Sequence, residues 1–311
     1  MNPRFPWGIP ALMYGEQPPR SDLESVWDGY RQALQRGSSP FGAALEVASS
    51  VDRLGLAFAA GYSAALQTLV PDVVLPCALC VTEIEGSHPR AIKTTLRAAE
   101  VGSSYALNGT KTFVTFGNLA KTLIIAARAG EHADGTPELV VVRIPTDRDG
   151  VSLIDLPPIS FVPEVPHSRV ELENVCVDPS ERMSGDGYLE YVKPFRTVED
   201  IHVYGSAVAY FFGLGKRTGA PAGFLAEMVS ILVALESLRE ATPLDPNTHV
   251  ALHGVGEHLS HLITSDEFLG IWDAAPPEER DRWERDRKLL DVAGSARRAR
   301  FQKAATQLGL C

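Results

Sequence analysis

The stretch that decides the fold is Tyr105–Ala127, YALNGTKTFVTFGNLAKTLIIAA, together with CVTEIEGS at Cys80–Ser87. Both segments are rich in β-branched and aromatic residues that alternate with polar ones, a pattern typical of strands. Asn108-Gly109 stands between alternating runs, and both residues tolerate the positive φ of a type I′ turn. We therefore predict two strands joined by a tight hairpin at Asn108-Gly109.

Strand signals continue on both sides of this stretch, from Val73 to about Val177. Short β-branched runs such as ELVVVRI and HSRVELENVCV are separated by the turn sequences HADGTP and DRDG. Turn residues between such runs are typical of antiparallel strands. The whole region is therefore predicted to form one β block.

Helical patterns flank this block. Ser21 is expected to cap a first helix, with Glu24 at the capping-box position. Pro40 can open a second helix, whose apolar residues recur at three- and four-residue spacing until Pro71 ends it. The chain turns helical again after Gly187. In EERDRWERDRKLL, acidic and basic residues recur at i,i+4 spacing, which predicts a solvated helix face.

Helices, then strands, then helices indicate an α+β protein with segregated layers. We predict an N-terminal helical domain over residues 1–72, a central β domain over 73–185 and a C-terminal helical bundle over 186–311. A chain of 311 residues with 45% hydrophobic residues can bury the core that such a division requires.

The composition argues against several classes of protein. Lys and Arg total 29 and Asp and Glu total 39, so the formal net charge is −10. Nucleic-acid-binding surfaces are normally basic. No apolar run approaches the length of a membrane span, and the N-terminal MNPRFPWGIP lacks the apolar core of a signal peptide. We expect a cytoplasmic protein that binds neither nucleic acid nor membrane.

Two patterns could in principle bind a metal. Cys77 and Cys80 form a lone CxxC in an apolar segment typical of a buried strand, which favours reduced core cysteines. Histidines of the segment 249–261 recur at i,i+4 spacing, but two glycines weaken that helix and no catalytic carboxylate motif accompanies them. We predict no metal site.

The segments Cys80–Ser87 and Tyr105–Ala127 resemble the acyl-CoA dehydrogenase family. In that family a Thr-Glu-Pro…Gly-Ser loop precedes an Asn-Gly-x-Lys hairpin and an aromatic-x-Thr strand. The matching segments here are Thr82–Ser87, Asn108–Lys111 and Phe113–Thr115. The later ELENVCVDPSERMSGDGYLEYVKPF resembles the passage from the family's β domain into its C-terminal bundle. The resemblance covers about Leu45 to Gly213.

This resemblance implies a fold and a set of partners. The fold would consist of N-terminal helices, a central β-barrel-like domain and a C-terminal helical bundle, with both helical domains shortened. The cofactor would be FAD and the substrate an acyl-CoA or related thioester. The assembly would be a homo-oligomer or a heteromer with a second family member.

The candidate cofactor residues follow from the resemblance and from the chemistry of a flavin. An isoalloxazine ring needs flat apolar walls and a few hydrogen bonds. Thr82 and Thr115 can supply hydroxyl and backbone N–H donors, and Phe113, two residues before Thr115, can cover the ring from the same strand face. Ser87 lies where the family's matching Ser contacts the cofactor or the thioester ligand. Without the resemblance, β-propensity and core packing would explain these residues.

The catalytic base is less well marked. Desaturation of an acyl thioester needs a carboxylate within reach of the α-proton. The family's base usually lies in a Tyr-Glu-Gly-Thr-like turn after a Gly-Gly loop, and this chain has neither. Other members carry the base on the first long helix of the bundle, where alignment of the motifs places Val198, followed by Glu199 and Asp200. Glu199 is the candidate base, and a solvated carboxylate at a helix start is the alternative.

Further positions depart from the family pattern. Ile84 replaces the Pro of the loop, and His88 replaces the acidic residue after Ser. The Arg-Lys-x-Phe-Gly-like segment that helps to hold the cofactor's pyrophosphate is missing, and Lys216-Arg217 or Arg297-Arg298 could substitute for it. Solvated charges are the alternative interpretation of both pairs.

The sequence thus predicts an FAD-dependent oxidoreductase acting on the CH–CH group of an acyl-CoA or similar thioester. A non-catalytic or partner-dependent subunit is one alternative, favoured by the missing base and pyrophosphate motifs. A flavin monooxygenase-like relative, which needs no α-proton base, is the other.

Overall fold

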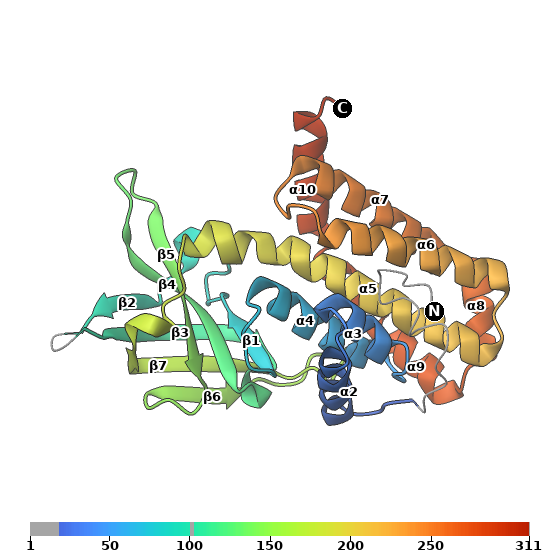
Figure 1. Ribbon diagram of the computed structural model, residues 1–311, viewed down its shortest axis with the longest axis horizontal. Helices are drawn as coiled ribbons and strands as arrows, with labels where there is room; N and C mark the ends of the chain where they lie inside the picture. Colours follow the sequence, from blue (N-terminus) through green and yellow to red (C-terminus); the bar gives the residue numbers. More distant parts are fainter. Residues whose placement is uncertain (1–18, 100–102, 311) are drawn as a thin grey trace. The chain divides into compact units, whose positions relative to one another are not determined.

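The computed structural model describes residues 19–99 and 103–310, which form two compact units. The β unit spans Leu69–Ile159 and Val165–Arg196. The helical unit holds the described residues up to Thr68, the short segment Ser160–Glu164 and the described residues from Thr197 onward (Figure 1). The α+β class is therefore confirmed. The N-terminal MNPRFPWGIP, on which the expectation about a signal peptide rests, lies outside the described residues.

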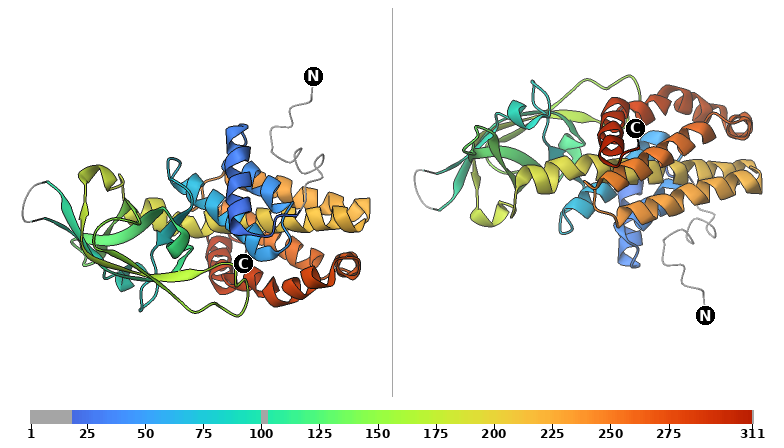
Figure 2. Two further views of the ribbon diagram at one scale, coloured as in Figure 1. Left: turned by 90° about the horizontal axis from the view of Figure 1, so that it is seen from below. Right: turned by 90° about the horizontal axis from the view of Figure 1, so that it is seen from above.

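The β unit is built on one seven-stranded sheet that curls on itself (Figure 2). The sheet order is β1-β4-β2-β3-β7-β6, and β5 pairs with β4 off this path. β1 and β2 pair with β4 in parallel, and the other pairs are antiparallel. The strands are β1 (Cys77–Cys80), β2 (Thr95–Ala98), β3 (Tyr105–Thr115), β4 (Thr122–Glu131), β5 (Pro137–Pro145), β6 (Val151–Asp155) and β7 (His167–Val177). The strand patterns of the sequence match β1, β3, β4, β5 and β7.

β4 has a continuous apolar run because both of its faces are covered. On one face Ile125 belongs to the main core of the sheet, with Leu107 and Val170. On the other face Ala126 packs with Ile92 and Leu139, and the π-helical turn η4 (Gly187–Val192) adds Tyr188 and Val192 to this layer. Strands buried on both faces lose the polar alternation of half-exposed strands.

The predicted hairpin at Asn108-Gly109 is wrong, because both residues lie inside the continuous strand β3. The pairing of β3 with β7 shifts register between Leu107 and Gly109. Gly109 has φ +151, and a Cβ there would lie 2.4 Å from Thr94 Oγ1. The side chain of Asn108 accepts a hydrogen bond from the backbone N–H of Asn174 at 2.8 Å. Asn-Gly therefore forms a bulge with a close backbone approach instead of a turn.

The helical unit contains the long helices that the sequence predicts on both sides of the strands. Within it, α6 and α7 run side by side, and α10 packs on α7 (Figures 1 and 2). The helices are α2 (Leu23–Gln35), α3 (Pro40–Ala48), α4 (Leu54–Leu69), α5 (Lys193–Thr218), α6 (Ala222–Arg239), α7 (Pro246–Leu262), α8 (Asp266–Asp273), α9 (Pro277–Asp286) and α10 (Gly294–Gln307). None of the helices in the described residues is long and apolar enough to cross a bilayer.

Two helix predictions need correction at their ends. The N-cap of α2 is Asp22 and not Ser21, because the Asp22 carboxylate accepts the N–H of Ser25 at 2.8 Å. The predicted second helix is really two, α3 and α4. The hydroxyl groups of Ser49 and Ser50 donate to the backbone carbonyls of Glu46 and Val47, and such bonds compete with the helical ladder.

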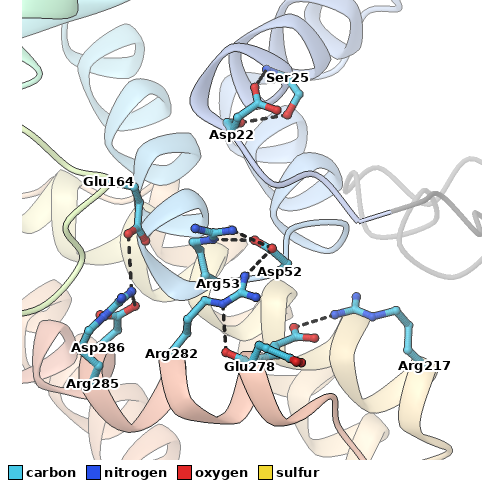
Figure 3. Close-up of polar contacts among 11 residues, drawn as sticks. Asp22, Ser25, Asp52, Arg53, Glu164, Arg217, Glu278, Arg282, Arg285 and Asp286 are labelled. Atoms are coloured by element: carbon cyan, nitrogen blue, oxygen red, sulfur yellow. Dashed lines mark hydrogen bonds and ion pairs between the residues drawn. The ribbon is translucent and has the colours of Figure 1, made fainter.

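The charged face predicted on α9 is largely exposed, as at Glu278, Asp281 and Glu284, but two of its arginines also reach other segments. Arg282 pairs with Asp52, at the turn before α4, and Arg285 pairs with Asp286 and Glu164 (Figure 3). The carboxylate of Asp286 is fully buried and accepts the N–H of Val162 at 2.7 Å. These charges therefore link α9 to other segments of the helical unit.

Candidate functional site

Three of the predicted site residues gather at one end of β3. The backbone N–H of Thr112 donates to the carbonyl of Thr82 at 2.8 Å, which places Thr82 beside the strand. Thr115 pairs with His167 on β7, and the Phe113 ring stands edge-on to the His167 imidazole with a centroid distance of 6.4 Å. Thr82, Phe113 and Thr115 therefore belong to the same part of the β unit.

Phe113 combines two unusual properties. Its backbone is left-handed, with φ +51, where the register of β3 shifts between Lys111 and Val114. Its side chain is 62% exposed, although the adjacent Val114 is buried. A non-glycine residue in this conformation carries strain, which proteins keep mostly where a ligand or a reaction requires it. The bulge thus presents a flat aromatic ring to the surroundings of the β unit.

A buried ion pair fixes the loop that carries Thr82. The Nζ atom of Lys111, fully buried, lies 2.7 Å from Oε1 of Glu83, which is 6% exposed. The same carboxylate accepts hydrogen bonds from the N–H of Lys93 at 2.8 Å and from the N–H and hydroxyl of Thr94 at 3.0 and 2.7 Å. Glu83 follows Thr82 directly, so this network holds Thr82 in place.

The network also sets the charge state of Glu83. Burial alone would raise the pKa of this carboxyl, but the Lys111 ammonium and the hydrogen bonds from Lys111, Lys93 and Thr94 together bring the pKa below its ordinary value. Burial lowers the pKa of Lys111, and the Glu83 carboxylate opposes that shift. Glu83 is therefore held as a carboxylate that anchors the loop and is not a free acid or base.

Ser87 lies just beyond the tip of the same loop. Glu83 and Gly86 exchange two backbone hydrogen bonds of 3.0 and 2.9 Å, and Gly86 has φ +110. The tip exposes Ile84 almost completely, at 97%, where the family has its Pro. Ser87 and His88 follow as exposed residues, and His88 caps the short 3-10 helix η1 (Pro89–Ala91). Ser87 is thus accessible beside the anchored turn.

Glu199 belongs to the helical unit, so it is not in the unit that carries the other candidates. It is half-buried on α5. Its neighbour Asp200 is buried and pairs with Arg297, at 3.0 Å, and with Arg300, both on α10. Val198, at the position aligned with the family's base, is buried and apolar. Asp200 is thus engaged by arginines, and the role of Glu199 as a base stays a prediction.

The cationic pairs suggested for the pyrophosphate also differ in their surroundings. Arg217 contacts Glu279 at 2.9 Å within the helical unit. Arg297 is bound to Asp200, whereas Arg298 is exposed and lines a pocket between α7 and α10.

The sequence predicted neither the Glu83–Lys111 pair nor the proximity of His167 to Phe113. A buried Lys facing an acidic residue of another segment has no local signal in the sequence.

The two metal-like patterns have ordinary surroundings. Cys77 and Cys80 are buried on β1 and free, and burial raises the pKa of the Cys80 thiol to about 12. The imidazole of His253 stacks on Phe301 with a centroid distance of 3.7 Å. Within residues 19–99 and 103–310, no group of three or more His, Cys, Asp and Glu side chains is arranged to hold a metal ion.

Comparison with known proteins gives one family match, within the β unit. Residues 78–175 match the family model described as acyl-CoA dehydrogenase, middle domain. This range contains Thr82, Phe113, Thr115 and both members of the Glu83–Lys111 pair. No curated protein matches the sequence.

Solved structures extend the likeness to most of the chain. An FAD-dependent dehydrogenase superposes with a TM-score of 0.67 at 16% identity, over 98% of this chain and 97% of that one. FMN-bound TdsC from Paenibacillus sp. A11-2 gives 0.66 at 17% identity, over 90% and 88%. Butyryl-CoA dehydrogenase from Megasphaera elsdenii gives 0.60 at 14% identity, over 90% and 85%. The chain is therefore a divergent protein with the acyl-CoA dehydrogenase-like fold, and its central segment matches that family's middle domain.

Proposed function

We propose that this protein is a flavin-dependent oxidoreductase. The observation that carries the proposal is the exposed ring of Phe113, held in a left-handed bulge beside Thr82 and Thr115. Core packing does not explain the strained backbone of Phe113, because the side chain of this residue is exposed. A bound planar ligand would use this exposed ring.

The residues present suit an isoalloxazine ring. Phe113 offers a flat apolar surface, and the hydroxyl groups of Thr82 and Thr115 can donate to ring nitrogen or oxygen atoms. The Glu83–Lys111 network keeps Thr82 from moving, so its donor is preorganised. A bound flavin would supply the hydride acceptor. The β unit would supply binding and orientation, and Ser87 at the exposed turn would contact the cofactor or substrate.

FAD is the cofactor that we propose, and an acyl thioester, such as an acyl-CoA, is the proposed substrate. The structural neighbours include a butyryl-CoA dehydrogenase and an FAD-dependent dehydrogenase, which supports this choice, although TdsC is described as FMN-bound. Removal of the α-proton would then fall to the carboxylate of Glu199. We further propose a cytoplasmic location and an oligomeric assembly, either of identical chains or with a second family member.

One observation favours a second candidate function. Asp200 is bound by two arginines and Val198 is apolar, so α-proton removal would rest on Glu199 alone in this part of α5. A flavin monooxygenase-like reaction needs no such base, and a partner-dependent subunit could receive one from a second chain.

The variant Glu199→Gln separates these possibilities. Desaturase activity should fall at least about a hundredfold if Glu199 is the base, which is the usual contribution of general-base catalysis.

Flavin binding is the first test. Riboflavin, FMN and FAD should each be titrated into the purified protein, and binding followed by flavin fluorescence and visible absorbance. Phe113→Ala should weaken the binding of all three, because the isoalloxazine is common to them. Ile154→Ala, which truncates another partly exposed apolar residue of the β unit, is the matched control and should bind like the wild type. Wild-type protein that binds none of the three flavins would refute the proposal.

A further inference from the structure

The last helix, α10, is the most basic element of an acidic chain. Its sequence GSARRARFQKAATQ contains three arginines and one lysine but no acidic residue, although acidic residues outnumber basic ones by 39 to 29 in the whole chain. Surface clusters of arginine with free donors are suited to anions, which they bind with directional hydrogen bonds.

A pocket of about 140 Å³ lies along this helix, inside the helical unit. One wall is α10 with Arg297, Arg298 and Arg300. The facing wall is α7 with His253 and Ser260, and Tyr204 of α5 also lines the space. The volume is suited to a small polar group and not to a whole dinucleotide.

Two of the three arginines form a fixed wall. Arg297 and Arg300 both bind the buried carboxylate of Asp200, and the Arg297 guanidinium also lies over the Tyr204 ring, 5.1 Å from its centroid. Two cations share one carboxylate here, and each guanidinium carries five N–H donors, more than these bonds use. The wall therefore retains positive charge and free donors.

Arg298 differs from its two neighbours. Among the ion pairs that the structure describes, none includes Arg298, and its side chain is exposed. Its guanidinium folds back over the first turn of α10, so that a Cβ on Gly294 would lie 3.4 Å from Nη1. Gly294 also lines the pocket. The glycine therefore leaves room for Arg298 at the N-terminal end of the helix.

Carboxylates also lie around this pocket. Asp291 and Glu257 also line it, and both are exposed to solvent, which screens them. Together with Asp200 behind the wall, these carboxylates balance the three arginines, so the donors of Arg298, and not a net positive charge, favour an anion here. The residue before α10, Ala293, offers no side-chain cap, so the first N–H groups of the helix add their partial positive charge on the same side.

We propose that this pocket binds a phosphate group of a small ligand and that Arg298 is its principal donor. Lys216-Arg217 and Arg297-Arg298 are the two pairs that could replace the missing phosphate-holding segment. The structure favours Arg298, because Arg217 and Arg297 are engaged by Glu279 and Asp200. The site lies in the helical unit and does not require the flavin face of the β unit, so each proposal can fail without the other.

Inorganic pyrophosphate is the probe, titrated calorimetrically into the full-length protein at low salt. The wild type should bind it, and Arg298→Gln should weaken binding by about tenfold or more, the effect of losing a charge-assisted hydrogen bond. Arg298→Lys should retain part of the affinity. Lys303→Gln is the matched control, since it removes one charge from an exposed position of α10 outside the pocket lining, and it should stay within about twofold of the wild type.

Three results would overturn the proposal: wild-type protein that does not bind pyrophosphate, Arg298→Gln protein that binds it normally, or equal losses in Arg298→Gln and Lys303→Gln. Competition then distinguishes the two sources of the phosphate. Displacement of pyrophosphate by FAD but not by riboflavin would assign the pocket to a dinucleotide cofactor. Displacement by coenzyme A but not by pantetheine would assign it to a thioester substrate. Displacement by neither would support a phosphate-bearing ligand of another kind.

Discussion

Glu83 in the β unit and Glu164 in the helical unit are both carboxylates withdrawn from solvent, and their surroundings differ. Glu83 accepts four hydrogen bonds, one of them from the buried Lys111. Both oxygens of Glu164 are buried, and neither accepts a hydrogen bond of normal geometry from the described residues. Its ion pair with Arg285 is long, at 3.6 Å (Figure 3).

The pKa shifts of the two groups are opposite for this reason. Hydrogen bonds and the Lys111 charge outweigh burial at Glu83 and lower its pKa. Burial dominates at Glu164 and raises its pKa, and the nearby Asp286 adds to that rise. Burial of a carboxylate thus stabilises the fold only where its partners are complete. The complete network belongs to the loop that carries Thr82, which is the loop that we expect to face the cofactor.

The largest expected effect comes from breaking the complete network. Lys111→Met leaves Glu83 buried without its cation and should lower the free energy of unfolding by about 3–5 kcal/mol, measured by urea denaturation. The double variant Glu83→Gln/Lys111→Met removes both charges and should recover much of that loss. A single variant within about 1 kcal/mol of the wild type would show that the pair contributes little.

Neutralising each carboxylate separately should have opposite consequences. Glu83→Gln removes the partner of Lys111 and should cost roughly 2–3 kcal/mol in the free energy of unfolding at pH 7. Glu164→Gln removes a charge that burial disfavours and should stabilise the fold by up to about 1 kcal/mol. Glu173→Gln, at an exposed position of β7, is the control and should remain within about 0.5 kcal/mol. Equal losses at Glu83 and Glu164 would contradict the comparison.

The two groups should also respond to pH in opposite directions. Glu83 has a pKa below its ordinary value of 4.5, so its contribution is present above pH 4.5 and is lost as the pH falls through the folded-state pKa. Glu164 has a raised pKa, so its contribution is present below pH 4.5 and is lost as the pH rises through the folded-state pKa. Urea denaturation across this range should show that Glu83→Gln loses less of its free energy of unfolding than the wild type as the pH falls. In Glu164→Gln the free energy of unfolding should decrease less with rising pH than in the wild type.

The smallest expected effect concerns the strain at Phe113, which lies beside the anchored loop. Phe113→Gly should be about 1 kcal/mol more stable than Phe113→Ala, because glycine adopts φ +51 without penalty. Both variants should lose flavin affinity alike, since both lack the ring. At Thr110, an exposed position of β3 without positive φ, alanine should be the more stable of the two. The same order at both positions would mean that Phe113 is not strained.

Local patterns predicted much of this fold. The β-branched runs between Val73 and Val177 correspond to β1, β3, β4, β5 and β7, and Pro40 and Pro71 mark true helix limits. Such signals work because strand and helix periodicity reflect which side chains are buried. β2 and β6 were missed, since they have 4 and 5 residues and carry too little pattern to stand out.

Long-range contacts caused the other errors. Asn108-Gly109 has the composition of a hairpin turn, but Thr94 and Asn174, distant in sequence, make it a bulge inside β3. Likewise, the ion pairs of Arg282 and Arg285 were not predicted, because their partners Asp52 and Glu164 lie far away in the chain. The candidate flavin residues were named from a family resemblance, and their grouping beside His167 appeared only in the folded β unit.

By itself, then, the sequence determined the α+β class, the central β block and the loop-and-strand motifs of an acyl-CoA dehydrogenase middle domain. These features can be predicted from periodicity and from short motifs, because both depend on residues that are close together in the sequence. Only the tertiary structure decided the surroundings of individual charged residues. Glu83 anchors a loop, Asp200 is bound by two arginines, and Arg298 is exposed in a pocket lining. Glu83, Asp200 and Arg298 differ in role because burial and partners, and not residue type, set the free energy of a charge.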